Sequence, residues 1–212
     1  MKATQFIKDH GVEKARKGMI YGVGINDLRE PVCNDGEKLP QYTMWQRMLS
    51  RAYSKSFLGK RPTYVGTSVC DRWLRLSNFM QDVQTIENYD KAINSGWQLD
   101  KDVLTKGNKH YSLSTCCFVP REINTLLINS KKTRGEYPIG VFYDNRDKKI
   151  RACVKIDKRN KFIGSFNNVE DAFQAYKQAK EHHIKEVAER WKGIIADNVY
   201  QALINWKVEI TD

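Results

Sequence analysis

The sequence predicts an α+β fold in which helices and antiparallel strands occupy separate stretches of the chain. In several segments apolar residues recur every three or four positions, the spacing of one buried helix face. Between positions 139 and 166 apolar and polar residues alternate around two turn sequences, which is typical of antiparallel strands. The longest apolar runs are a few residues, too short for a membrane span, so we expect no membrane partner.

The first half of the chain is predicted to be mainly helical. Residues 1–18 show a short helical pattern, and residues 21–40 are rich in the Gly, Pro, Asn and Asp typical of loops. One amphipathic helix is predicted from position 42, and a short strand over 64–69 precedes a second. We expect both apolar stripes to be core: Tyr42, Trp45, Met48, Leu49 and Ala52 in the first helix, and Trp73, Leu76, Phe79, Met80 and Val83 in the second.

A strand, a loop, a second strand and a helix are predicted between positions 97 and 127. The loop contains a Gly-Asn turn at Gly107, and Pro120 suits the first turn of the helix. The stretch 129–138, "NSKKTRGEYP", is polar and lacks apolar periodicity, so we place a domain boundary there.

The second half is predicted to form three antiparallel strands followed by a long helix. Asn168 is the expected helix cap, with acidic residues in the first turn. Residues from Ile195 to Trp206 then predict a closing helix. The expected organisation is an extension over 1–40, a domain over 41–130, a domain over 136–192 and a docking helix over 193–212.

The cysteines argue for reduced thiols. There are five, with no CxxC pair, which disfavours a disulfide framework and a cysteine-based zinc site. Of the adjacent Cys116 and Cys117, we expect one to be buried and the other partly exposed. The first residues contain no apolar stretch of signal-peptide length, so we expect a cytoplasmic protein.

The basic charge is concentrated in one segment. The net charge of the chain is +11, and residues 131–165 hold eleven Lys or Arg against four acidic residues, a local charge of +7. This is the distribution expected of a phosphate-binding face. The alternative is a lysine surface that serves only solubility, which would spread its charge evenly.

Residues 139–180 resemble the APETALA/ethylene-response-factor type of DNA-binding domain, a module also found in phage homing endonucleases. The resemblance rests on "GVFYDNRDKKIRACVKI", "KFIGSF" and "EDAFQAY". It implies that a three-stranded sheet enters the major groove of double-stranded DNA while the helix supports it from behind. Ile150 and Phe162 stand where the plant domains carry tryptophan. The expected DNA contacts are Arg146, Arg151, Lys155, Lys158, Arg159 and Lys161, with Arg146 and Arg151 among the base contacts and the lysines on phosphates.

Residues 42–127 resemble phage proteins related to HNH endonucleases, whose core is a ββα unit. The motifs are "YTMWQRMLSRAYS", "YVGTSVCDRWLRLSNFMQDV" and "LDKDVLTKGNKHYSLSTCCFVPREIN". The resemblance implies a divalent metal ion, Mg²⁺, that assists phosphodiester cleavage. It places a metal ligand at Asp100, another near Asn124, and Lys101 where the family has its general-base histidine.

The exchange of histidine for lysine leaves two readings open. Lysine has a reference pKa of about 10.4 and is a poor base unless burial lowers that value, but it can hold a phosphate. His110 is a candidate replacement base, or an ordinary surface residue. On a regular strand Asp102 lies on the same side as Asp100 and adds a second carboxylate for Mg²⁺; alternatively both are turn acids or ion-pair partners of lysines.

These observations predict a phage protein, located in the host cytoplasm, that binds double-stranded DNA and is a candidate for metal-dependent nicking or cleavage. The alternative is a catalytically inactive DNA-binding protein that regulates transcription or inhibits a host enzyme, with a host or phage protein as a further partner. An RNA-binding factor is allowed by the charge and less favoured by the order of elements.

Overall fold

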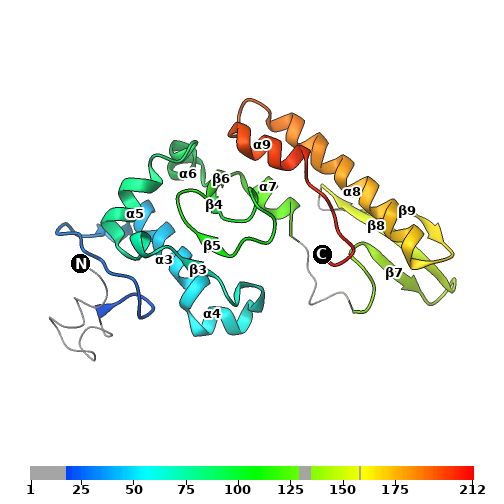
Figure 1. Ribbon diagram of the computed structural model, residues 1–212, viewed down its shortest axis with the longest axis horizontal. Helices are drawn as coiled ribbons and strands as arrows, with labels where there is room; N and C mark the ends of the chain where they lie inside the picture. The colour runs from blue at the N-terminus through cyan, green and yellow to red at the C-terminus, as the bar shows by residue number, and fades with distance from the viewer. Residues whose placement is uncertain (1–17, 129–134, 158) are drawn as a thin grey trace. The chain divides into compact units, whose positions relative to one another are not determined.

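The computed structural model describes residues 18–128, 135–157 and 159–212 (Figure 1). Contacts divide the chain into two compact units, one ending at Arg121 and one beginning at Glu122. The predicted α+β class is confirmed: helices accompany short paired strands in the first unit, and a three-stranded antiparallel sheet packs on a helix in the second. The predicted helix over 1–18 falls almost wholly outside the described residues, as do Lys158 and most of the predicted boundary.

Helix α3 (Pro40–Tyr53) forms the centre of the first unit. It begins at a proline, which suits a first helical turn, and all five residues of its predicted apolar stripe are buried. The Trp45 Nε1 atom donates a hydrogen bond of 2.7 Å to the carbonyl oxygen of Trp73. Helix α4 (Lys55–Lys60) follows, capped by the Ser54 side chain, which accepts from the amide of Phe57.

The segment after α4 differs from the prediction. A 3-10 helix over Pro62–Tyr64 takes up part of the expected strand, which is reduced to β3 (Ser68–Val69). The second predicted helix is split into a 3-10 turn (Asp71–Leu74) and helix α5 (Leu76–Val83). Four of its five expected core residues are buried, and Met80 is half-buried. Helix α6 (Tyr89–Ser95) was not predicted.

The strands of the first unit form three small pairs. Strands β1 (Cys33–Asn34) and β2 (Glu37–Lys38) form a hairpin within the predicted loop, and β4 (Gln98–Asp100) pairs antiparallel with β6 (Cys117–Val119). The segment between β4 and β6 is more than the expected loop, because its strand β5 (His110–Tyr111) pairs in parallel with β3. Helix α7 (Arg121–Leu126) begins directly after Pro120 and spans the division between the units.

Both adjacent thiols are buried, so the expectation that one of them is partly exposed is wrong. Cys116 is 4% exposed and Cys117 is 3% exposed. Cys117 belongs to β6, all of whose residues are buried, and Cys116 enters that strand from a turn closed by Ser112 and Thr115. Because both faces of β6 are buried, the alternation of side chains along the strand exposes neither thiol.

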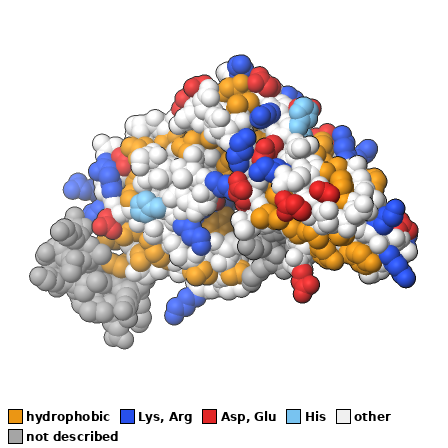
Figure 2. Space-filling model, turned by 45° about the vertical axis from the view of Figure 1, so that its right-hand side comes forward, with side chains coloured by type: hydrophobic (Ala, Val, Ile, Leu, Met, Phe, Trp, Pro, Cys, Tyr) orange, Lys and Arg blue, Asp and Glu red, His pale blue; other side chains and the backbone are white. Residues whose placement is uncertain are grey.

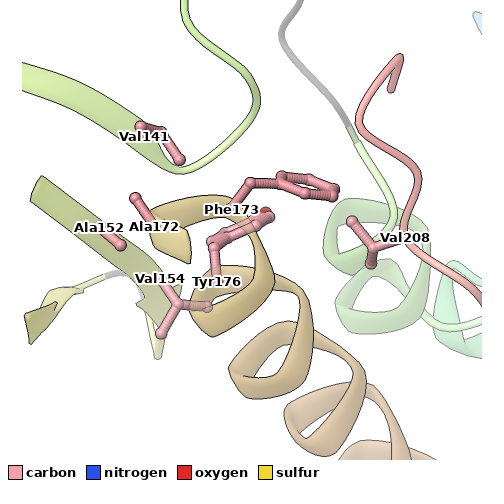
Figure 3. Packing of buried hydrophobic residues seen from close by; sticks show 7 residues of the cluster. All are labelled: Val141, Ala152, Val154, Ala172, Phe173, Tyr176 and Val208. Carbon is pink, nitrogen blue, oxygen red and sulfur yellow. The ribbon is translucent and has the colours of Figure 1, made fainter. Parts of the chain in front are cut away.

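The second unit is a sheet covered on one face by a long helix (Figure 1). Strands β7 (Val141–Asp144), β8 (Lys149–Ile156) and β9 (Arg159–Phe166) are antiparallel in that order. Helix α8 (Val169–Trp191) begins at the predicted cap, where the Asn168 side chain accepts a 2.8 Å hydrogen bond from the Asp171 amide. Figure 3 shows the core between them, formed by Val141, Ala152, Val154, Ala172, Phe173, Tyr176 and Val208.

The closing helix is shorter than predicted. Helix α9 (Asp197–Ile204) packs against α8, while Ile195 and Trp206 lie outside it. The chain after α9 is fastened to α8 through Val208, whose carbonyl accepts from Lys177 Nζ at 2.6 Å and whose amide donates to Glu181 at 2.9 Å. In the described ranges, every helix falls short of the length or hydrophobicity needed to cross a bilayer.

Candidate nucleic-acid interface

The face of the β7–β8–β9 sheet opposite α8 is the first candidate site. Residues paired across antiparallel strands project to the same face. Ala152 and Val154 are buried under α8, so Arg151, Cys153 and Lys155 project to the other side. We name this the outer sheet face and define it by register as Phe142, Asp144, Lys149, Arg151, Cys153, Lys155, Asn160, Phe162 and Ser165.

Two phenylalanines stand exposed on the outer sheet face. Phe162 is 62% exposed and Phe142 is 40% exposed. Phe162 lies next to a register shift between Ala152 and Cys153, an irregularity that increases local twist and re-aims neighbouring side chains. Figure 2 shows that exposed hydrophobic side chains lie among both basic and acidic side chains on the viewed surface. In the major groove of a duplex, an exposed phenylalanine can contact the thymine methyl group while neighbouring cations contact phosphates.

Arg151 is held in place by the protein itself. Its guanidinium lies 2.6 Å from an Asp144 oxygen, is also paired with Asp147, and is centred 5.6 Å from the ring of Phe162. The Arg151 side chain is only 23% exposed, and its Nε is buried without a hydrogen-bond partner. The guanidinium is thus oriented before any ligand arrives, and its role as a base contact stays a prediction.

The other predicted DNA contacts do not all share this face. Lys155 projects from it, and Arg146 extends from the β7–β8 turn with its side chain 88% exposed. Lys161 is paired with buried Val154 and Arg159 with Ile156, so both leave the sheet on the α8 side. The expectation that those two join Arg151 on one face is therefore wrong, because the register sets their side.

Sequence reasoning missed Lys149, Phe142 and Phe162 as members of this face. Lys149 is paired with Asp144 and is exposed. The available signal was strand alternation, because Lys149 precedes Arg151 by two positions. For Phe142 and Phe162 the signal was an apolar residue at a strand position where alternation predicts exposure to solvent.

The segment Asp100–Val103 of the first unit is the second candidate site. Strand β4 ends at Asp100, and Asp102 lies in a bend. The two residues are therefore not on one regular strand, which was the basis for expecting their carboxylates on the same side. The Asp100 Oδ1 atom accepts hydrogen bonds from the amides of Asp102 (2.8 Å) and Val103 (3.0 Å). This is the local geometry of a turn acid.

Lys101 is buried rather than presented to a substrate. The residue is 6% exposed, and its Nζ lies 3.1 Å from Asp102 Oδ2. The same ammonium group is 5.6 Å from the ring centre of Tyr64 and 5.8 Å from that of Tyr111. A buried cation needs such compensation, and here one carboxylate and two aromatic faces provide it.

Burial also dominates the acid-base properties around Asp100. Desolvation, followed by the charge of Asp102, raises the pKa of Asp100 to about 7. Desolvation likewise raises the pKa of Tyr111 above its ordinary range, while Arg51 nearby opposes that rise. Asp100 is consequently a mixture of protonated and ionised carboxyl near neutral pH.

His110 and Asn124 are the remaining residues of the predicted nuclease site. His110 is exposed on β5, and its Nδ1 lies 2.8 Å from Ser68 Oγ. The neighbouring Asn108 side chain donates to the carbonyl oxygens of Lys101 (2.6 Å) and His110 (2.8 Å), which ties the two segments together through backbone. Asn124 lies on α7 in the part of that helix that belongs to the second unit.

The residues of the Asp100 segment do not fit a Mg²⁺ ion. Magnesium requires several oxygen ligands in near-octahedral geometry. One oxygen of Asp100 is occupied by two backbone amides, and Asp102 is paired with the buried ammonium of Lys101. Across the described part of the chain, no three His, Cys, Asp or Glu side chains gather as a metal site would require.

Comparison with known proteins leaves both resemblances as predictions. No protein-family model matches the chain, and neither a curated protein nor a solved structure matches it.

Proposed function

We propose that this protein binds double-stranded DNA through the outer sheet face and does not cleave it at the Asp100 segment. The observation that carries the proposal is the composition of that face, on which Phe142 and Phe162 stand beside Lys149, Arg151 and Lys155. Two carboxylates oppose these cations: Asp144 belongs to the face by register, and Asp147 pairs with Arg151. The expected role is a DNA-binding regulator of transcription or inhibitor of a host enzyme.

The dimensions of the sheet support duplex binding. Strands β8 and β9 have eight residues each and form an antiparallel ribbon. The major groove of B-DNA admits a two-stranded ribbon of this kind. Because α8 covers the opposite face, the ribbon can present its outer side chains to a groove without loss of the hydrophobic core.

Binding to a labelled duplex, followed by fluorescence anisotropy over about 50 to 200 mM salt, tests the proposal. We expect affinity to fall steeply with salt because phosphate contacts release counterions. Lys155→Gln should weaken binding and reduce the magnitude of the salt slope by about 1. Lys185→Gln, an exposed position on α8, is the control with the same change of charge and should bind as wild type.

Two results would overturn the proposal. One is the absence of duplex binding at low salt. The other is equal loss of affinity in Lys155→Gln and Lys185→Gln, which would show a diffuse charge effect with no preferred face. Tighter binding to single-stranded DNA or RNA than to duplex would replace the proposed ligand.

A further inference from the structure

A cavity of about 250 Å³ lies in the first unit between helix α3 and the segment that leads into β4. Its lining combines cationic and apolar side chains. Arg47 and Arg51 come from α3, and Trp97 lies on the other side of the cavity with Gln98 and Leu99.

The two arginines occupy one side of the helix. Positions 47 and 51 are four residues apart, so their side chains lie one above the other. Arg51 is partly buried and hydrogen-bonds the hydroxyl of Tyr111, itself 2% exposed. A guanidinium carries five N–H donors, and a phenol oxygen satisfies only part of them.

Within the described part of the chain, no carboxylate lines the cavity. Among the described residues, neither Arg47 nor Arg51 forms an ion pair with a carboxylate, although other arginines of this unit do, as Arg72 does with Asp82 at 2.7 Å. The acidic residue that acts on Arg51 electrostatically is Asp100, whose Oδ1 is already bound by two backbone amides. The guanidinium groups of Arg47 and Arg51 therefore keep N–H donors that no described carboxylate occupies, and an anion in the cavity could accept from them.

We propose that this cavity binds a phosphate group attached to a small planar apolar group. Guanidinium pairs suit phosphate because their donors match its oxygens in a bidentate arrangement. Met44 and Trp97 contribute apolar surface to the cavity for the attached ring, and the Lys91 Nζ atom lies 4.8 Å from the centre of the Trp97 ring. The volume is below that of a typical drug-sized pocket, so it accommodates at most a ligand about the size of a mononucleotide.

Isothermal titration of the full chain with adenosine 5′-monophosphate tests this assignment, with inorganic phosphate and adenosine as the two halves of the probe. We expect saturable binding of the monophosphate, weaker binding of phosphate, and none of adenosine. Arg47→Gln and Arg51→Gln should each weaken binding at least about tenfold. Arg61→Gln, an exposed arginine of the same unit, is the control and should bind as wild type.

Arg47 is the decisive position because it is exposed, so its replacement leaves the packing of α3 intact even where Arg51→Gln lowers stability. Competition with duplex DNA identifies the source of the phosphate. If duplex DNA displaces adenosine 5′-monophosphate from the protein, the site binds the DNA backbone. If the monophosphate stays bound, the site binds a free phosphate monoester. The absence of saturable binding overturns the proposal, and so does equal weakening by Arg61→Gln. The titrations with adenosine 5′-monophosphate, phosphate and adenosine do not involve the outer sheet face, so their outcome is independent of the proposed DNA binding.

Discussion

Lys101 shows how strongly its surroundings define what one side chain does. At this position the ammonium group is enclosed by Asp102, Tyr64 and Tyr111 and is almost inaccessible to solvent. The residue that the HNH resemblance predicted at the general-base position is therefore part of a buried network of charged and aromatic groups. The same burial accounts for the altered pKa of Asp100.

The raised pKa of Asp100 predicts a stability that depends on pH. The folded carboxyl holds its proton up to about pH 7, whereas the unfolded one releases it near 3.8, so stability falls as pH rises between these values. Asp100→Asn keeps the acceptor oxygen and removes the titration. We expect urea unfolding to show wild type losing more than about 1 kcal/mol relative to the variant between pH 5 and pH 8. Parallel pH profiles for the two proteins would contradict this.

The position of Gly140 in the second unit leaves no room for a side chain. Its φ is +77°, and an added Cβ would lie 2.0 Å from the ring of Tyr176, a core residue. We expect Gly140→Ala to lower the free energy of unfolding by about 2 kcal/mol or more, since strain and overpacking add. Gly135 has a similar φ of +70° with open space around it, so Gly135→Ala measures the backbone cost alone. Equal losses in thermal or urea unfolding would exclude the clash.

Helix α8 and the sheet beneath it follow from local rules. The cap at Asn168, the acidic first turn and the apolar spacing predict a helix start that the structure confirms. Helix α6 was missed because none of its residues is buried, so it carries no hydrophobic period, and its two ends are set by Asn88 and Gly96 in left-handed conformations.

The cap at Asn168 can be tested by one substitution. Asn168→Ala removes the acceptor of the Asp171 amide and should cost about 1 kcal/mol in urea unfolding. Asn168→Ser should recover most of this loss, because a serine oxygen can accept the same hydrogen bond. Identical stability of the alanine and serine variants would show that the cap contributes nothing measurable.

At the level of the entire protein, we expect DNA binding without DNA hydrolysis. Supercoiled plasmid incubated with Mg²⁺ or Mn²⁺ should remain intact at protein concentrations that retard it in a gel, because the Asp100 segment does not fit the metal. Asp100→Ala and Asp102→Ala should leave this result unchanged. Nicking by wild type that both variants lose would assign a cleavage site to this segment.

The amino-acid sequence by itself determined where α3, the three strands of the second unit and α8 lie, since periodicity and capping are properties of a few consecutive residues. Folding decided which side chains share a surface. Lys155 and Lys161 belong to one basic segment, yet the strand register places them on opposite faces of the sheet. The surroundings of Arg51 are also set by residues far from it in the sequence. Arg51 hydrogen-bonds Tyr111 and is affected electrostatically by Asp100. Such properties arise from contacts between distant segments, which no local pattern of residues encodes.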